Sequence, residues 1–160
     1  ATDPAFARSC LATVTPNAGY GDITHITLYR VHQRVAKVFR LGRVFLAGDA
    51  AHINNPLGGM GMNGGIHDAV NLTDRLARVW HGECPDRELD RYDLQRRLIT
   101  LEYVQKHTIQ NKRNLEARDP HDRDRFRSEM RSILADAHKI HGYLERVSMI
   151  ASLKRAAELG

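Results

Sequence analysis

The chain is poor in cysteine and has no long apolar run. Its 160 residues include two cysteines, Cys10 and Cys84, too few and too widely separated for a disulfide framework or a thiolate metal cage. We therefore expect no metal site and a reducing, cytoplasmic location. No apolar run approaches the roughly eighteen residues that span a bilayer, so no membrane partner is expected.

The sequence also lacks a segment with charges of only one sign. The formal net charge is +5, yet residues 118–127 alternate acids and bases, which is typical of a solvated face rather than a phosphate-binding stripe. We expect no nucleic-acid partner. His138 and His141 have the spacing of a metal-ligand pair, but no thiolate or carboxylate cluster accompanies them. No Gly-x-Ser-x-Gly, Walker or Cys-x-x-Cys motif is present, and we identify no catalytic side chain.

The most informative segment joins a short apolar run to a glycine-rich loop and a helix. Residues 44–47 are apolar and bounded by glycine, as expected of a buried strand, so Asp49 follows the carboxyl end of that strand. Five glycines lie within residues 58–65, where backbone can approach a ligand closely. From Ile66 the apolar residues follow helical spacing up to Trp80. A helix that begins at the glycines directs unpaired N–H groups at whatever lies before it.

Residues 59–64 also match G-x-G-x-x-G, and Glu83 follows roughly twenty residues later. A dinucleotide fingerprint requires its first glycine directly after a strand, within a βαβ unit. Here the expected strand ends well before that, at Ala47, and Glu83 lies between Gly82 and Pro85. We therefore do not interpret the pattern as a dinucleotide site.

The whole segment resembles the second flavin-binding motif of FAD-dependent aromatic hydroxylases of the para-hydroxybenzoate hydroxylase type. The matching elements are Gly48-Asp49-Ala50-Ala51-His52, Pro56, Gly58-Gly59, Gly61-Met62-Asn63, Asp68-Ala69 and Asn71-Leu72. This resemblance implies an FAD- and NAD(P)H-dependent monooxygenase that uses molecular oxygen to hydroxylate a small aromatic, phenolic substrate.

The resemblance also implies a set of cofactor-binding residues. They are Gly48, Asp49, Pro56, Gly58, Gly59, Gly61, Met62 and Asn63. The Asp49 carboxylate is expected to accept a hydrogen bond from a ribityl hydroxyl, and Pro56 to lie by the isoalloxazine ring. The backbone of residues 61–63 is expected to face the pyrimidine edge, where N–H groups at a helix start would stabilise negative charge on the reduced flavin.

The predicted fold class is an α/β fragment that is predominantly helical. Residues 1–40, with β-leaning runs at 11–15 and 23–31, are expected to be the last strands of a substrate-binding domain. Residues 41–82 hold the flavin-binding motif, and residues 83–160 form a helical region.

The helical region can be divided at its helix breakers. Residues 86–118 contain no glycine or proline, and one unbroken helix would be near 50 Å long at about 1.5 Å per residue, so we expect a bend or break. Asp119-Pro120 ends it, and a second helix begins at about His121. Gly142 is expected to interrupt that region before a third apolar stripe.

Several alternatives remain open at this stage. The apolar stripes of the tail either pack within the protein or support a homodimer. The tail could make the chain a non-catalytic helical interaction module, and the same motif occurs in flavin-dependent oxidoreductases that do not hydroxylate. The first, ADP-binding motif of the family does not precede Ala1, so we expect a fragment that partners a missing N-terminal part, holds FAD weakly and is inactive alone.

Overall fold

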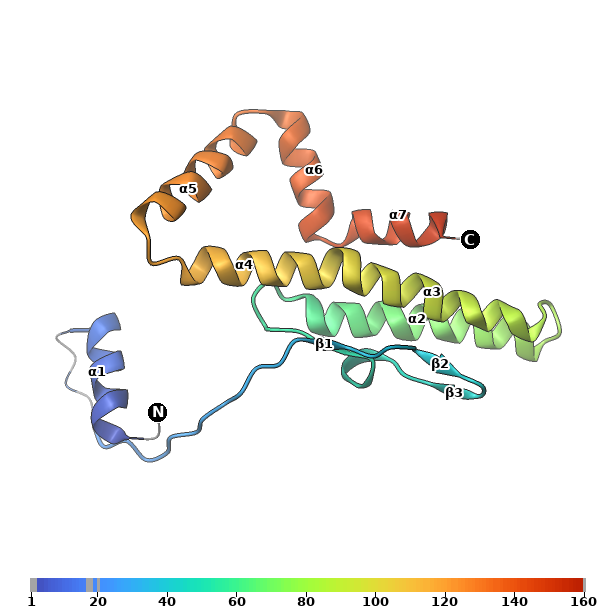
Figure 1. Ribbon diagram of the computed structural model, residues 1–160, viewed down its shortest axis with the longest axis horizontal. Coiled ribbons are helices and arrows are strands. Elements are labelled where there is room, and N and C mark those ends of the chain that lie inside the picture. The colour runs from blue at the N-terminus through green and yellow to red at the C-terminus, as the bar shows by residue number, and fades with distance from the viewer. Residues whose placement is uncertain (1–2, 17–18, 20, 160) are drawn as a thin grey trace. The chain divides into compact units, whose positions relative to one another are not determined.

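The structure is a computed structural model that describes residues 3–16, 19 and 21–159, and it divides into two compact units, Ala1–Val31 and His32–Gly160. In the first unit, helix α1 spans Pro4–Val14 (Figure 1). The Asp3 carboxylate accepts the Ala5 N–H at 3.0 Å, and proline occupies the first helical position.

This helix corrects the strand predicted for residues 11–15. An Asp-Pro start caps and nucleates a helix, which then continues through β-branched residues that favour strands in isolation. Residues 23–31, also predicted as a strand, form none, because the described residues of the first unit contain no second strand to pair with.

The second unit begins with two small antiparallel ladders. Strand β1, Arg34–Val35, pairs with β4, His52–Ile53, and strand β2, Arg40–Leu41, pairs with β3, Val44–Phe45. The β2–β3 hairpin turns through Gly42, whose φ of +60° suits glycine. The strand predicted at residues 44–47 is therefore present, but it is shorter than expected.

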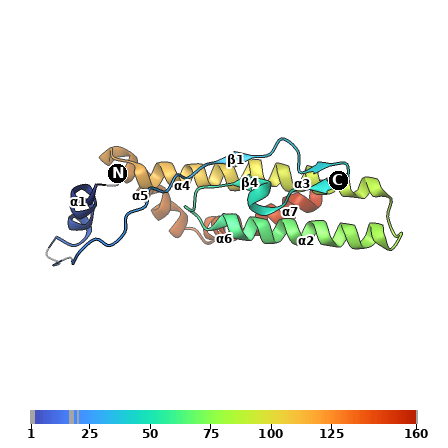
Figure 2. The same ribbon diagram turned by 90° about the horizontal axis from the view of Figure 1, so that it is seen from below.

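These strands pack against a helical hairpin. Helix α2, Met60–Trp80, is followed by a 3-10 turn at Asp86–Leu89 and helix α3, Asp90–Ile99, which returns alongside α2 (Figures 1 and 2). Tyr92 on α3 is fully buried against Phe39 and Ala51 from the strand layer. The main apolar cluster therefore joins the strands to the hairpin.

A bend or a break was predicted within residues 86–118; the chain remains helical from Asp86 to Glu116, so there is no break. Instead, a π-helical segment at Thr100–Gln105 leads into helix α4, Lys106–Glu116. The side-chain amide of Gln33 donates to the Gln105 carbonyl at 3.3 Å and to Thr108 Oγ1 at 2.7 Å. A side chain that hydrogen-bonds to a backbone carbonyl of a helix is a recognised cause of such local widening.

Three helices complete the chain: α5, Pro120–Leu134; α6, Ala137–Val147; and α7, Ile150–Glu158. Asp119 caps α5 by accepting the His121 N–H at 2.9 Å, which confirms the predicted stop and restart. Gly142 does not interrupt the region, because α6 runs through it. The breaks lie at residues 135–136, between α5 and α6, and at Met149, which has a φ of +64°.

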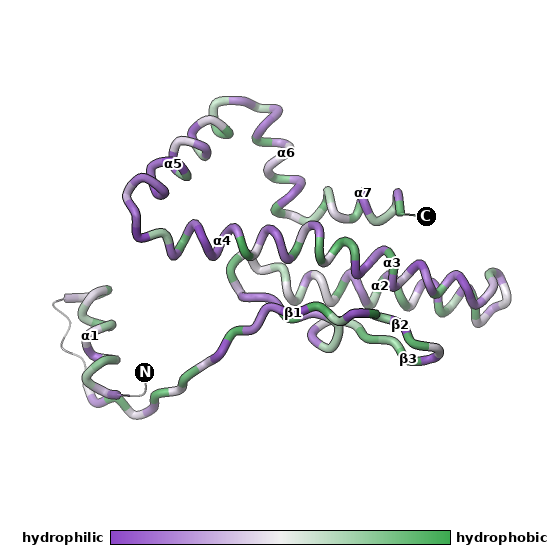
Figure 3. Tube along the Cα trace, in the orientation of Figure 1, coloured by the Kyte–Doolittle hydropathy of each residue, from purple (hydrophilic) through white to green (hydrophobic). Residues whose placement is uncertain are grey.

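The outer helices are weakly packed. Helices α4 and α5 are largely hydrophilic along their length (Figure 3), and the described residues of α5 include no buried side chain. Helix α7 instead contacts α3 and buries Ser152 and Ala156. None of the described helices combines the length and apolar character needed to cross a membrane. The fold is thus mostly helical with small antiparallel ladders, in agreement with the broad fold class predicted.

Helix α2 is oriented with its apolar side outward. Ile66, Val70 and Trp80 are 51%, 64% and 85% exposed, whereas Asp68 is fully buried and Arg75 is 9% exposed. The apolar stripe seen in the sequence is therefore present, but within this chain the polar side of the helix faces the interior.

Candidate flavin-binding corner

A tight corner follows strand β3. Gly48 has a φ of +58° and opens a 3-10 turn over Gly48–Ala50, closed by the Ala51 N–H donating to the Gly48 carbonyl at 2.9 Å. This turn leaves the Asp49 side chain exposed to solvent. The positive φ explains the glycine, because other residues are strained in that conformation.

The corner lies directly against helix α2. A Cβ atom added at Gly65 would lie only 3.2 Å from Gly48 Cα, and one added at Gly64 would lie 3.3 Å from His52 Cε1. Two helix glycines thus allow the corner and His52 to approach the helix backbone so closely that a Cβ at either position would require its neighbour to shift by a few tenths of an ångström.

One buried carboxylate holds the corner to the helix. Asp68 Oδ2 accepts the Gly48 N–H at 3.0 Å and lies 2.7 Å from His52 Nε2, while Asp68 Oδ1 accepts Arg96 Nε at 2.7 Å. Asp68, His52 and Arg96 are each at most 2% exposed. Burial raises the pKa of the Asp68 carboxyl, but the His52 hydrogen bond and the Arg96 charge outweigh it and hold the pKa below its ordinary value.

Removal of one partner from such a buried pair would leave an uncompensated charge, at a cost of about 3–5 kcal/mol. Two further bonds hold the strands around the corner. The Tyr92 hydroxyl donates to the Leu46 carbonyl at 2.6 Å, and the Phe39 N–H donates to Asp93 Oδ1 at 2.7 Å. Burial raises the pKa of Tyr92 well above its ordinary value, so the hydroxyl keeps the proton it donates.

The loop between the corner and α2 is held by a second group of amides. Buried Asn55 accepts the Leu57 N–H at 3.1 Å and donates to Gln33 Oε1 at 2.7 Å and to the Thr108 carbonyl at 3.2 Å. Asn111 donates to the Leu57 carbonyl at 3.3 Å. These contacts hold the loop from the side of helix α4, and Pro56 and Gly58 remain exposed.

The start of α2 has no side-chain cap. Gly59, with a φ of +65°, occupies the capping position, and Asn63 Nδ2 donates to the Gly59 carbonyl at 2.9 Å. Met62 is 76% exposed. The first N–H groups of the helix therefore have no capping side chain, which is the arrangement that favours negative charge at a helix N-terminus.

The structure places the sequence-predicted residues on the corner, the loop and the start of α2. Gly48 and Gly61 are half-buried, whereas Asp49, Pro56, Gly58, Gly59, Met62 and Asn63 are exposed. The carboxylate of Asp49 and the backbone of the other residues are thus accessible to a ligand. The described residues contain no group of three or more side chains suited to holding a metal ion.

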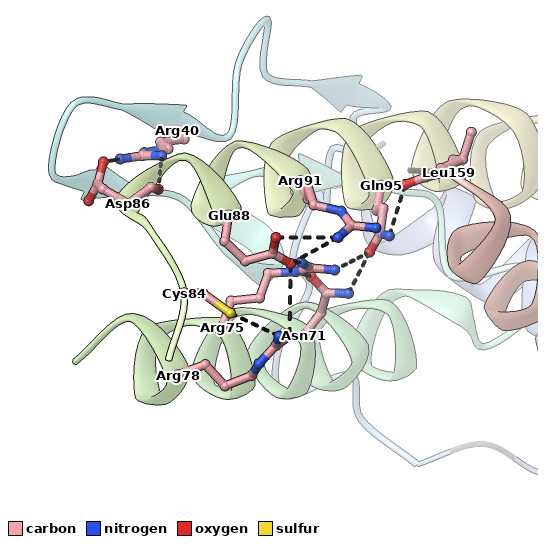
Figure 4. Close-up of polar contacts among 10 residues, drawn as sticks. All are labelled: Arg40, Asn71, Arg75, Arg78, Cys84, Asp86, Glu88, Arg91, Gln95 and Leu159. Carbon is pink, nitrogen blue, oxygen red and sulfur yellow. Dashed lines mark hydrogen bonds and ion pairs between the residues drawn. The ribbon is translucent and has the colours of Figure 1, made fainter. Parts of the chain in front are cut away.

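The sequence analysis missed a polar network on the inner side of the hairpin (Figure 4). Arg75 bonds Asn71 at 3.1 Å, Gln95 at 2.8 Å and the carboxylate of Glu88, which Arg91 also contacts at 3.3 Å. Burial raises the pKa of Glu88, but the Arg91 hydrogen bond and the Arg75 charge outweigh it and keep the carboxyl ionised. The network joins α2 to α3 without contact with the corner.

Comparison with known proteins identifies the family. The family model described as "FAD binding domain" matches residues 1–107. Para-nitrophenol 4-monooxygenase of Pseudomonas sp. strain WBC-3 is 39% identical over 130 residues, 75% of this chain and 32% of the relative. The 3-(3-hydroxy-phenyl)propionate/3-hydroxycinnamic acid hydroxylase of Mycolicibacterium vanbaalenii is 47% identical over 97 residues, 61% of this chain and 17% of the relative.

A solved structure agrees. The crystal structure of p-nitrophenol 4-monooxygenase PnpA from Pseudomonas putida DLL-E4 superposes with a TM-score of 0.75 and 32% identity, over 91% of this chain and 39% of that one. The chain therefore spans about a third or less of the length of the curated relatives it matches. The family match covers most of the sequence and includes the whole corner, loop and helix α2, and the chain belongs to the FAD binding domain family.

Proposed function

We propose that this chain supplies the flavin-contacting corner of an FAD-dependent monooxygenase that hydroxylates an aromatic compound, with NAD(P)H as reductant. The observation that carries the proposal is the exposed Asp49 carboxylate beside an uncapped, glycine-rich helix start. Of the two relatives named above, one is a monooxygenase and the other a hydroxylase, and each is named for an aromatic compound, in agreement with this chemistry.

The residues present fit FAD. The Asp49 side chain is exposed, and the positive φ values of Gly58 and Gly59 favour glycine at both positions, so the loop backbone there carries no side chain that would block a ligand. Asp49 would accept a hydrogen bond from a ribityl hydroxyl, and Pro56 would lie by the ring system. The N–H groups of residues 61–63 would face its pyrimidine edge.

When bound, FAD supplies the redox chemistry that joins NAD(P)H oxidation to oxygen insertion into the substrate. The role of this chain is to bind and orient. The N–H groups at the start of α2 would offer a positive potential to the pyrimidine edge of the bound flavin. The rigid loop around Pro56 helps to exclude water from one side of the ring.

The chain covers only part of the relatives' length, and we further propose that a part of the full-length protein beyond this chain, the remainder of the protein, covers the outward face of α2. That face consists of Met62, Ile66, Val70, Leu76 and Trp80, all exposed in this chain. Contiguous exposed apolar side chains of this kind mark an interface. A Val70→Asp change should abolish assembly with that remainder, whereas Asp74→Asn, on the same helix, should not.

Cofactor binding tests the proposal directly. A chimera would carry this chain in place of the matching segment of the Pseudomonas para-nitrophenol 4-monooxygenase. We expect it to purify yellow with bound FAD. Asp49→Ala should weaken FAD binding about tenfold or more, since a charged hydrogen bond contributes about 1.5–3 kcal/mol. A colourless chimera, or an unchanged affinity in the variant, would contradict the assignment and favour a helical interaction module.

Turnover tests the reaction class. The yellow chimera should oxidise NAD(P)H and consume oxygen faster with a phenolic substrate than without one, and should release hydroxylated product. NAD(P)H oxidation that no member of a phenol panel stimulates would instead indicate a flavin-dependent oxidoreductase that does not hydroxylate.

A further inference from the structure

We infer that Asp68 is a positioning residue for the flavin, which acts by fixing the Gly48 corner and hence the direction in which Asp49 is presented. The inference rests on the proposed role of Asp49. Asp68 itself is fully buried, so it can act only through its neighbours.

The Gly48 N–H is the link between the two aspartates. It donates to Asp68 Oδ2 at 3.0 Å, and the next residue in the chain is Asp49. The Gly48 carbonyl is also held, by the Ala51 N–H at 2.9 Å. The first bond holds the peptide before Gly48 and the second holds the peptide that leads into Asp49, so neither plane has much freedom to rotate.

Only a carboxylate can satisfy the three donors that meet here. Asp68 Oδ1 receives Arg96 Nε, and Oδ2 receives the Gly48 N–H and His52 Nε2. An asparagine has one acceptor oxygen and one NH2 group. Whichever way its amide is turned, the NH2 group faces either the Arg96 donor or the donors of Gly48 and His52.

This geometry yields a matched pair of variants. Asp68→Asn should release the corner, because Arg96 retains the amide oxygen as the charged donor. In the double variant Asp68→Asn/Arg96→Gln, glutamine carries its amide atoms at the same point along the side chain as arginine Nε. Its oxygen can accept from the asparagine NH2 group, which returns the asparagine oxygen to Gly48. Asp74→Asn, at an exposed position of α2, is the control.

The readout is hydrogen exchange of the Gly48 amide, measured on the full chain by NMR, together with FAD affinity from flavin fluorescence. In the wild-type chain this amide should exchange as slowly as buried amides of α2. Asp68→Asn should accelerate its exchange and weaken FAD binding, each about tenfold, and the double variant should restore both to within about threefold. A general loss of packing would not be restored by a second buried substitution.

Other outcomes separate the two proposals. The inference would be overturned if the Gly48 amide exchanged fast in the wild-type chain, or if Asp68→Asn left its exchange rate unchanged. Neither result requires that the variants bind FAD. If the Gly48 amide shows the expected exchange pattern but Asp49→Ala leaves the FAD affinity unchanged, the proposed role of Asp49 is refuted. The contact by which Asp68 fixes the corner would still stand. Unchanged FAD affinity in Asp68→Asn, with Asp49 still required, would refute the positioning role alone.

Discussion

The close approach of the corner to helix α2 can be tested with two glycine-to-alanine substitutions in one helix. At Gly65 the added Cβ would lie 3.2 Å from Gly48 Cα, a backbone atom. At Gly61 the nearest atom would be Asn54 Nδ2 at 3.8 Å, an ordinary contact. Gly61 therefore serves as the matched control for Gly65.

The magnitude follows from two opposing effects. Alanine in place of glycine gains about 1 kcal/mol in a helix interior and less in the first turn. Overpacking by one methyl group costs about 1–3 kcal/mol when the neighbour cannot move. Gly48 is bonded at both its N–H and its carbonyl, so it cannot retreat without breaking one of those bonds. We expect Gly65→Ala to be about 1–2 kcal/mol less stable than Gly61→Ala.

Urea unfolding followed by far-UV circular dichroism measures this difference. At about 2–4 °C per kcal/mol for a chain of this size, thermal melts should separate the two variants by roughly 2–8 °C. Equal slopes in urea would show that the variants unfold from comparably compact states. If Gly65→Ala proved as stable as Gly61→Ala, or more stable, the close packing of the corner on the helix would be refuted.

Three further outcomes are expected. Tyr92→Phe should lose about 1 kcal/mol of unfolding free energy in urea, because the Leu46 carbonyl loses its donor; no loss would refute that bond. Gly142→Ala should gain about 0.5–1 kcal/mol by the same assay, since α6 runs through this position; destabilisation would argue for a break there. Burial, with nearby arginines, lowers the pKa of His67 and of His107 below 6.5, so the unfolded chain binds more protons and melting temperature should fall as pH drops below 6.5. Replacement of both histidines by glutamine should flatten that dependence, and an unaltered slope would contradict it.

Local sequence chemistry was sufficient to predict the order of elements around the corner. The glycines predicted a strand before Gly48 and a helix that begins within the glycine run, and Asp119-Pro120 located the start of α5. Each of these depends on residues close in sequence, where φ restrictions and capping act directly. The place of Asp49 after a strand was likewise predicted, and its role as a cofactor ligand stays a prediction.

Errors arose where local preference competes with longer-range packing. Gly142 lowers helix propensity by only about 1 kcal/mol, which the Asp136 cap and the packing of α6 against α7 offset. Thr13 and Val14 favour strands in isolation, yet they continue a helix already started at Asp3-Pro4. In both cases the weaker local signal was taken for the deciding one.

The buried polar side of α2 could not be predicted from periodicity. A helical stripe shows which residues share a face, but it does not show which face is inside. Asp68 meets Arg96 across 28 residues, and Arg75 meets Gln95 across 20, so no local rule links them. The polar face turns inward because its charges satisfy one another there, and the apolar face is left exposed.

This inversion bears on how the corner is held. Apolar contacts are non-directional and tolerate small shifts, whereas a carboxylate with three fixed donors specifies one arrangement. The Asp68 cluster therefore defines the direction of the Gly48 peptide more narrowly than the nearby Phe39 and Tyr92 packing could. In its proposed role the Asp49 carboxylate would accept a hydrogen bond from a ribityl hydroxyl, and a hydrogen bond depends on direction as well as on distance. The buried charge is thus best understood as a means of orientation, and its contribution to stability is secondary.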